Sequence, residues 1–219
     1  MTDVNTFRAL QEAFSRGRMQ TYLDFARGDR QTALHHYARN AQLGAAFHGP
    51  LQALEVALRN AMHARLAARY GSRWYTVAAA GLDRHARDAT EAALNRGAAE
   101  PGRFVASMSL GFWVRLLGRG GHIDGGRKAD YERTLWRPAL FEAFPGRSRR
   151  MVHRRLDRLR QLRNRIAHHE PIFDRDLRED YEGLLEAVGW ISADVRRWIE
   201  THSLLPDALR APPSTPVCF

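Results

Sequence analysis

The sequence predicts an all-α protein built as a helical bundle, and three observations support this prediction. Apolar residues recur at spacings of three and four over most of the chain, which is the period of an amphipathic helix. Glycine and proline interrupt this pattern at short intervals, as they do between helices. Alternating apolar and polar stretches of useful length, which would predict strands, are missing, and so are internal repeats.

Single residues that start or stop helices divide the first half of the chain. Asp29 is a suitable N-cap, and Gly49-Pro50 predicts the end of one helix and the start of the next, because proline is favoured in a first turn. Gly71 ends the helix that follows. The helices predicted in this way cover residues 4–15, 20–27, 30–46, 51–70, 83–96, 102–117, 129–143, 147–169 and 175–200.

The second half of the chain combines long helices with two weaker segments. Glycines cluster at 118–126, which predicts a mobile surface loop, and four prolines from Pro206 onward predict a frayed tail over 206–219. The helix over 175–200 has one continuous apolar stripe and should pack lengthwise on a neighbour. This stripe consists of Leu177, Tyr181, Leu184, Val188, Ile191, Val195 and Trp198.

The helix over 147–169 has a similar stripe with one exception. Val152, Leu156, Leu159 and Ile166 follow the helical period, but Arg163 occupies the position between the last two. A charge there is costly unless it is paired or faces a cleft, and such breaks in a pattern tend to be functional. The alternative is that the arginine side chain extends outward past the apolar residues to solvent.

Length and composition describe one ordinary globular domain. The 219 residues can bury a sizeable core, with 44% hydrophobic and 26% charged residues. We expect a single domain over 1–205, with 1–48 as an N-terminal elaboration and 147–200 as a helix pair. The one cysteine, Cys218, excludes an internal disulfide. No leader or membrane span is recognisable, so we expect a cytoplasmic protein without a cofactor or a metal.

The net charge of +10 indicates a polyanionic partner, most often nucleic acid. Lys128 is the only lysine, so nearly all cations are arginines, which grip phosphate bidentately. A GC-rich genome would explain the preference for arginine over lysine but not the excess of charge. A basic membrane-surface protein would need a basic amphipathic helix with exposed aromatic residues, and no clear one is present.

Residues Leu162–Pro171 carry the most informative motif, in which Arg163-Asn164 is followed after three residues by His168. Asn164 and His168 are four residues apart and share a helix face. A histidine can move the proton of a ribose 2′-hydroxyl, and an arginine can neutralise charge on the phosphoryl oxygens. The motif therefore predicts cleavage of RNA to a 2′,3′-cyclic phosphate without a metal ion.

The same segment resembles the C-terminal signature of Abi-like (abortive infection) proteins of the AbiD/AbiF type. These belong to the HEPN superfamily, whose ribonucleases use an arginine and a histidine separated by four to six residues. The similarity spans roughly residues 20–200 and includes further blocks at Leu54–Asn60, Tyr70-Gly71, Trp74, Tyr37–Asn40 and Met108–Trp113.

The resemblance implies a HEPN-like helical bundle and a homodimer with an active cleft, which cleaves RNA in phage defence or in a toxin–antitoxin system. By motif, Arg163, Asn164 and His168 become the catalytic residues. Glu55 and Arg59 are a supporting pair, although their spacing of four residues also fits an ordinary ion pair on one helix face. An antitoxin RNA or protein is a further expected partner.

Several neighbouring residues are weaker candidates. His169 and Glu170 could support His168, although capping or ending the helix is the simpler role for both. His153 and Asp157 could line the cleft, or be solvated positions. The arginines most suited to RNA backbone contact, if they are not merely solvated, are Arg150, Arg154, Arg158 and Arg165.

Other groups of residues are weaker candidates for a functional site. His35 and His36 are adjacent on a helix and point apart, and no carboxylate completes a metal site. Trp74, Trp113 and Trp136 could stack bases, but core packing is the simpler role.

Two other functions compete with catalysis. The chain could be a non-catalytic RNA-binding module within a toxin–antitoxin or defence complex, with a steep salt dependence of binding. It could also be a structural helical dimer whose charge is only compositional.

Overall fold

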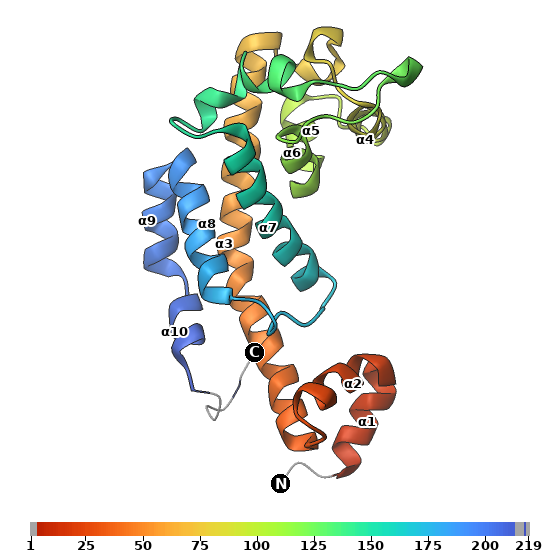
Figure 1. Ribbon diagram of the computed structural model, residues 1–219, viewed down its shortest axis with the longest axis vertical. Helices are drawn as coiled ribbons and strands as arrows, with labels where there is room; N and C mark the ends of the chain where they lie inside the picture. The colour runs from red at the N-terminus through yellow and green to blue at the C-terminus, as the bar shows by residue number, and fades with distance from the viewer. Residues whose placement is uncertain (1–3, 213–216, 218–219) are drawn as a thin grey trace. The chain divides into compact units, whose positions relative to one another are not determined.

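The structure, a computed structural model, describes residues 4–212 and residue 217. Over these residues the fold is all-α, as predicted, and the only β feature is an isolated bridge between His122 and Lys128 (Figure 1). Cys218 lies outside the described residues. No helix in the described part of the chain is both long and apolar enough to cross a bilayer.

Contacts group the chain into two compact units. Unit 1 comprises the segments Met1–Gly49, Arg165–Leu177 and Ser203–Phe219, and unit 2 comprises Pro50–Asn164 and Arg178–His202. The predicted N-terminal elaboration over 1–48 ends one residue before the first segment of unit 1 does. The single domain over 1–205 and its HEPN-like arrangement stay predictions.

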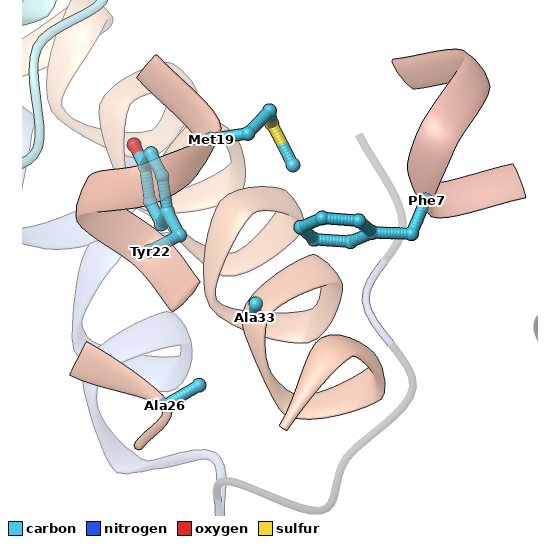
Figure 2. Close-up of a cluster of buried hydrophobic side chains, with 5 residues drawn as sticks. All are labelled: Phe7, Met19, Tyr22, Ala26 and Ala33. Carbon is cyan, nitrogen blue, oxygen red and sulfur yellow. The ribbon is translucent and has the colours of Figure 1, made fainter. Parts of the chain in front are cut away.

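Unit 1 has a small core formed by its first three helices. Helix α1 (Val4–Phe14), helix α2 (Arg16–Phe25) and the beginning of α3 (Arg30–Tyr70) contribute the buried residues. Tyr22 lies within this core, and its burial raises the pKa of the phenol to about 12. The buried cluster consists of Phe7, Met19, Tyr22, Ala26 and Ala33 (Figure 2).

Helix α3 corrects the prediction of a break at Gly49-Pro50. It runs from Arg30 to Tyr70 without interruption and contains the proline. Pro50 has no N–H to donate to the carbonyl of Ala46, which costs a mid-helix proline about 3 kcal/mol. Apolar side chains on both sides of this position are buried, and their burial outweighs the lost bond. These side chains are Phe47, Leu51, Leu54 and Leu58.

Unit 2 contains the remainder of α3 and most of the other helices. Within it, α7 contacts α3 and α8, as the ion pairs Arg163–Glu55 and Arg155–Glu186 show. Leu58, Leu156 and Leu184 from these three helices are fully buried. The helices are α4 (Arg84–Asn95), α5 (Pro101–Ser107), α6 (Leu110–Leu116), α7 (Arg149–Ala167), α8 (Leu177–Ile191) and α9 (Ala193–His202) (Figure 1).

Two predicted helices are divided by serine N-caps. The helix expected over 102–117 is split, because the Ser109 hydroxyl accepts a hydrogen bond from the amide of Phe112 and starts α6. The helix expected over 175–200 is split at Ser192, whose hydroxyl accepts from the amide of Val195. The predicted continuous stripe therefore ends with α8, and Trp198 on α9 is 54% exposed.

The segment between α6 and α7 is less regular than predicted. In place of a helix over 129–143 it has a π-helical turn, Glu132–Trp136, and a 3₁₀ turn, Leu140–Ala143. The glycine-rich stretch 118–126 has a defined course. The amide of Gly121 donates to the carboxylate of Asp83 at 2.7 Å, and Asp83 is 2% exposed.

The frayed tail predicted over 206–219 is wrong for its first residues, because Leu205–Arg210 form helix α10. Pro206 occupies the first turn, where proline is favoured, and Leu205 is fully buried. Arg39 donates hydrogen bonds to the carbonyls of Ala208 and Ala211 and so caps the end of the helix. Residues 213–216 and 218–219 lie outside the described part of the chain.

Candidate functional site

The end of α7 is a Schellman motif with His168 in the C-cap position. The amide of Glu170 donates to the carbonyl of Arg165 at 2.8 Å, and the amide of His169 donates to the carbonyl of Ile166 at 3.0 Å. His169 has a φ of +56°, which places it in the left-handed region. The helix therefore ends in a defined turn, not by fraying, and the backbone of His168 is fixed on that turn.

The left-handed residue of this turn is a histidine, where most helices have glycine. A non-glycine residue pays about 1 kcal/mol or more in that conformation, although histidine tolerates it better than most. Pro171 follows two residues later and disfavours a helical conformation at Glu170. Strain of this kind persists only when the surroundings hold the backbone in place.

Two side chains from elsewhere in unit 1 hold this turn. The Asn40 side-chain amide on α3 donates to the carbonyl of Glu170 at 3.3 Å, and its oxygen accepts from the amide of Ile172 at 2.7 Å. The Arg18 guanidinium on α2 donates to the carbonyl of His169. The carbonyls of His169 and Glu170 and the amide of Ile172 therefore all have hydrogen-bond partners outside α7.

Arg165 also stabilises this region, because it pairs with carboxylates in unit 1. Its guanidinium lies 3.0 Å from Asp174 and 3.8 Å from Glu170. The positive charge predicted to contact RNA is thus already partly neutralised. Glu170, a predicted supporting residue for His168, contacts Arg165 through its side chain.

In unit 2, the buried stripe of α7 continues through Leu162, and Arg163 extends outward beside it, which is the alternative to an interrupted stripe. Leu159 is 1% exposed and Leu162 fully buried, whereas the Arg163 side chain is 40% exposed. Its guanidinium lies 3.7 Å from the carboxylate of Glu55 on α3, whose side chain is 20% exposed. A pair this long and accessible contributes little to stability, so the arginine is available to another anion.

Glu55 and Arg59 were predicted as a pair, and the structure gives each a different partner. Glu55 faces Arg163, while Arg59 donates to the carbonyl of Ala106 at 3.4 Å. The alternative of an ordinary ion pair within α3 is therefore wrong. Residue spacing indicated that Glu55 and Arg59 share a face, but it could not show that α7 lies next to that face.

The other two motif residues are accessible as well. Asn164 is partly exposed on the last turns of α7, and His168 is exposed. Neither side chain hydrogen-bonds to any described residue. The chemically active groups of all three predicted catalytic residues therefore remain open to a substrate.

The arginines along α7 fall into two groups. Arg150 and Arg154 are exposed and pair with no described carboxylate. Arg158 instead contacts Asp180 at 2.6 Å and Glu179 at 2.7 Å, and the hydrogen bond to Asp180 raises the pKa of the guanidinium. Asp180 is 1% exposed. Arg158, predicted to contact RNA, thus pairs with a buried carboxylate. Three other arginines of α7 pair with partly exposed carboxylates: Arg149 with Glu132, Arg155 with Glu186 and Arg160 with Asp157.

Alternative sites receive less support. Asp157, a possible partner of His153, is 2.8 Å from Arg160. Burial lowers the pKa of His153. Among the described residues, no group of three or more histidine, cysteine, aspartate and glutamate side chains could hold a metal ion. The core-packing role is confirmed for Trp74, Trp113 and Trp136, which are all buried.

Positive charge is distributed very unequally between the two units. Unit 2 has 25 arginine and lysine residues against 16 acidic residues, a net charge of +9, and unit 1 has 9 against 8. Almost the whole excess therefore belongs to the unit that carries Arg163, Arg150 and Arg154. Unit 2 is therefore the part of the chain whose charge would attract a polyanion.

No protein-family model, curated protein or solved structure matches the chain. The resemblance to Abi-like proteins of the HEPN superfamily consequently stays an expectation based on the motif. Support for a function therefore comes from the accessibility and the contacts of the site residues themselves.

Sequence analysis missed two residues of the site, Asn40 and Arg18. Their hydrogen bonds join positions 130 to 151 residues apart, and no local pattern predicts pairs of that separation. Asn40 belongs to the block Tyr37–Asn40, which was singled out only for its resemblance.

Proposed function

We propose that the protein is a metal-independent endoribonuclease of HEPN type, acting in phage defence or in a toxin–antitoxin system. One observation carries the proposal: the side chains of Arg163 and Asn164 are partly exposed and that of His168 is exposed, beside the buried Leu159 and Leu162 of the same segment. The net charge of unit 2 supplies the attraction to RNA.

The proposed reaction needs only groups that the chain and its substrate contain. His168 accepts the proton of the 2′-hydroxyl, and the 2′-oxygen attacks the adjacent phosphorus. The bond from phosphorus to the 5′-oxygen breaks, and that oxygen takes a proton from water or from a second imidazole. The products are a 2′,3′-cyclic phosphate and a 5′-hydroxyl. In a homodimer, the second copy of His168 is the natural proton donor.

Arg163 would stabilise the charge that develops on the non-bridging oxygens. Its present partner is the Glu55 carboxylate, at 3.7 Å, which keeps the guanidinium in place without a short hydrogen bond. A phosphate can therefore bind without first breaking a strong ion pair. Asn164, with both a donor and an acceptor, would hold the phosphate or orient the imidazole.

The decisive test measures cleavage of a fluorescently labelled single-stranded RNA in excess EDTA. We expect the wild-type chain to cleave it and His168→Ala to lose at least about 100-fold in rate, the usual contribution of general acid–base catalysis. His85→Ala is the matched control, because His85 is an exposed histidine on α4. Equal rates for the wild type and His168→Ala would refute the mechanism.

The substrate provides an independent control. An RNA with a single 2′-deoxy nucleotide at the cleavage position should be resistant at that position, and mass spectrometry should identify the cyclic phosphate on the normal product. Cleavage of the deoxy-substituted bond would show that another nucleophile acts.

A second candidate is an RNA-binding module without catalysis, and the charge of unit 2 favours it. In that case the protein would bind RNA with a steep dependence on salt and leave it intact. The same EDTA assay, read together with a binding measurement, separates the two functions. An antitoxin RNA or protein would be a partner under either one.

A further inference from the structure

The Asn40 side chain bridges the backbone on both sides of Pro171. It donates to the carbonyl of Glu170 and accepts from the amide of Ile172. Asparagine suits this role, because its amide offers both a donor and an acceptor on one short, stiff side chain. Proline has no N–H of its own, so a turn built around Pro171 lacks one of the bonds that would otherwise hold it.

The same turn has a second external anchor one residue earlier. Arg18 donates to the carbonyl of His169, the residue with a φ of +56°. The two anchors come from α2 and α3 and bind backbone groups of His169, Glu170 and Ile172. They hold in place the left-handed residue on which the Schellman motif depends.

From this arrangement we infer that Asn40 is a positioning residue for His168, with Arg18 in support. The inference rests on the proposed function, since it concerns how accurately the proposed catalytic imidazole is placed. His168 has no side-chain hydrogen bond to any described residue, so the position of its backbone sets the region that the imidazole can reach. Asn40 acts on that backbone and touches no reacting atom.

Loss of the Asn40 bonds has a defined consequence. Without them, the turn after His169 is held only by the Schellman bonds and by Arg18, so the backbone can shift away from the strained left-handed conformation and carry the C-cap residue with it. A displacement of about 1 Å in a catalytic group can reduce the rate by roughly 100-fold. Affinity for RNA should change little, because the phosphate-binding charge belongs to unit 2.

The kinetic test compares single-turnover cleavage by Asn40→Ala with that by the wild type. We expect the cleavage rate constant to fall roughly 10- to 100-fold, while the RNA concentration giving half the maximal rate changes less than about twofold. Asn60→Ala is the matched control, an exposed asparagine on the same helix. A change only in the half-saturating RNA concentration, with an unchanged rate constant, would contradict a positioning role.

Two variants separate positioning from damage to the fold. Asn40→Asp still accepts from the amide of Ile172 but cannot donate to the carbonyl of Glu170, so its rate should lie between those of the wild type and Asn40→Ala. In a His168→Ala background, Asn40→Ala should have no further effect on residual cleavage. An undiminished effect in that background would show that Asn40 acts by another route.

A measurement without RNA distinguishes failure of this inference from failure of the proposed function. Hydrogen exchange at the amide of Ile172 should be at least roughly tenfold faster in Asn40→Ala than in the wild type or Asn60→Ala. If exchange at the Ile172 amide accelerates in Asn40→Ala but neither the wild type nor any variant cleaves RNA, Asn40 holds the turn and the ribonuclease proposal is wrong. If the protein cleaves RNA and Asn40→Ala matches the wild type, the positioning role is wrong.

Discussion

The two units of this chain differ in how much of their arginine charge is matched within the unit. Unit 1 has nearly balanced charge, and its arginines have internal partners such as the carbonyls that Arg18 and Arg39 bind and the carboxylates that Arg165 contacts. Unit 2 has a net charge of +9, and even after the inward side of α7 is matched with carboxylates, exposed arginines remain. A high arginine content is therefore not in itself a sign of nucleic-acid binding. The arginines that bear on nucleic-acid binding are those that pair with no carboxylate and no backbone carbonyl of the described residues.

The largest expected effect tests the ion pair between Arg158 and Asp180. Arg158→Ala removes the guanidinium that pairs with the buried Asp180 carboxylate, which should lower the free energy of unfolding by about 3 kcal/mol. Arg154→Ala on the exposed face should change it by less than about 0.5 kcal/mol. Urea unfolding followed by circular dichroism measures both. Similar losses in the two variants would remove the distinction between the faces of α7.

The next effect tests whether surplus charge in unit 2 meets RNA. Arg150→Ala combined with Arg154→Ala should weaken binding to single-stranded RNA roughly tenfold and lower the salt slope by about 0.7 for each phosphate that is no longer neutralised. Arg8→Ala with Arg16→Ala removes the same charge from unit 1 and should have little effect. Fluorescence anisotropy over a range of salt concentrations measures the RNA affinity and the salt slope of both double variants. Equal losses in the two double variants would mean that only total charge matters.

A smaller effect concerns the strained residue in unit 1. His169→Gly removes the steric cost of the left-handed conformation and should stabilise the protein by up to about 1 kcal/mol, or roughly 2–4 °C in Tm. His169→Ala lacks this relief and is the control for loss of the imidazole. Differential scanning calorimetry would show whether the glycine variant alone gains stability. No difference between the two would mean that the turn carries no strain.

The smallest effect is a dependence of stability on pH. Burial lowers the pKa of His36 in unit 1 and of His63 and His153 in unit 2. Below about pH 6.5 the unfolded chain therefore binds more protons than the folded one, and stability should fall as the pH decreases. Unit 2 contributes two of these groups, and the His63 imidazole also accepts a hydrogen bond from the Trp74 indole at 3.1 Å.

Unfolding curves at about pH 7.5 and about pH 5.5 measure this dependence. The double variant His63→Gln with His153→Gln should lose less stability between the two conditions than the wild type does, since it has fewer groups that resist protonation. His36→Gln, which changes one group in unit 1, should have a smaller influence. An unchanged dependence in the double variant would assign the acid sensitivity to other residues.

Helical periodicity predicted the all-α class and most of the helices, because burial of one face is a local property of the sequence. The interruption predicted at Arg163 was wrong, because Leu162 continues the buried stripe of α7 and the arginine side chain extends outward. Predictions failed where tertiary contacts outweighed a local signal. Pro50 was interpreted as a break, yet buried residues on both sides carry the helix through it. Ser109 and Ser192 were not recognised as N-caps, so two helices were predicted too long.

The candidate site was predictable only as far as it lies within one segment. Arg163, Asn164 and His168 occur within six residues, and their types alone suggest chemistry. Glu55 was named as a supporting residue, but its partner was not. Asn40 reaches the turn after α7 from a helix 130 residues away, and no single-sequence pattern reports such a contact.

The glycines at 118–126 have a practical consequence for attaching probes. Gly120 has a φ of +91°, and a Cβ there would lie 2.6 Å from the carbonyl oxygen of Ala129. A Cβ at Gly121 would lie 2.9 Å from the Asp83 carboxylate. Gly125 and Gly126, in contrast, have open space around the Cβ position and need only a residue that tolerates positive φ, such as asparagine. A peptide tag or a dye for single-molecule work therefore belongs at 125–126, and the two glycines before them should be left untouched.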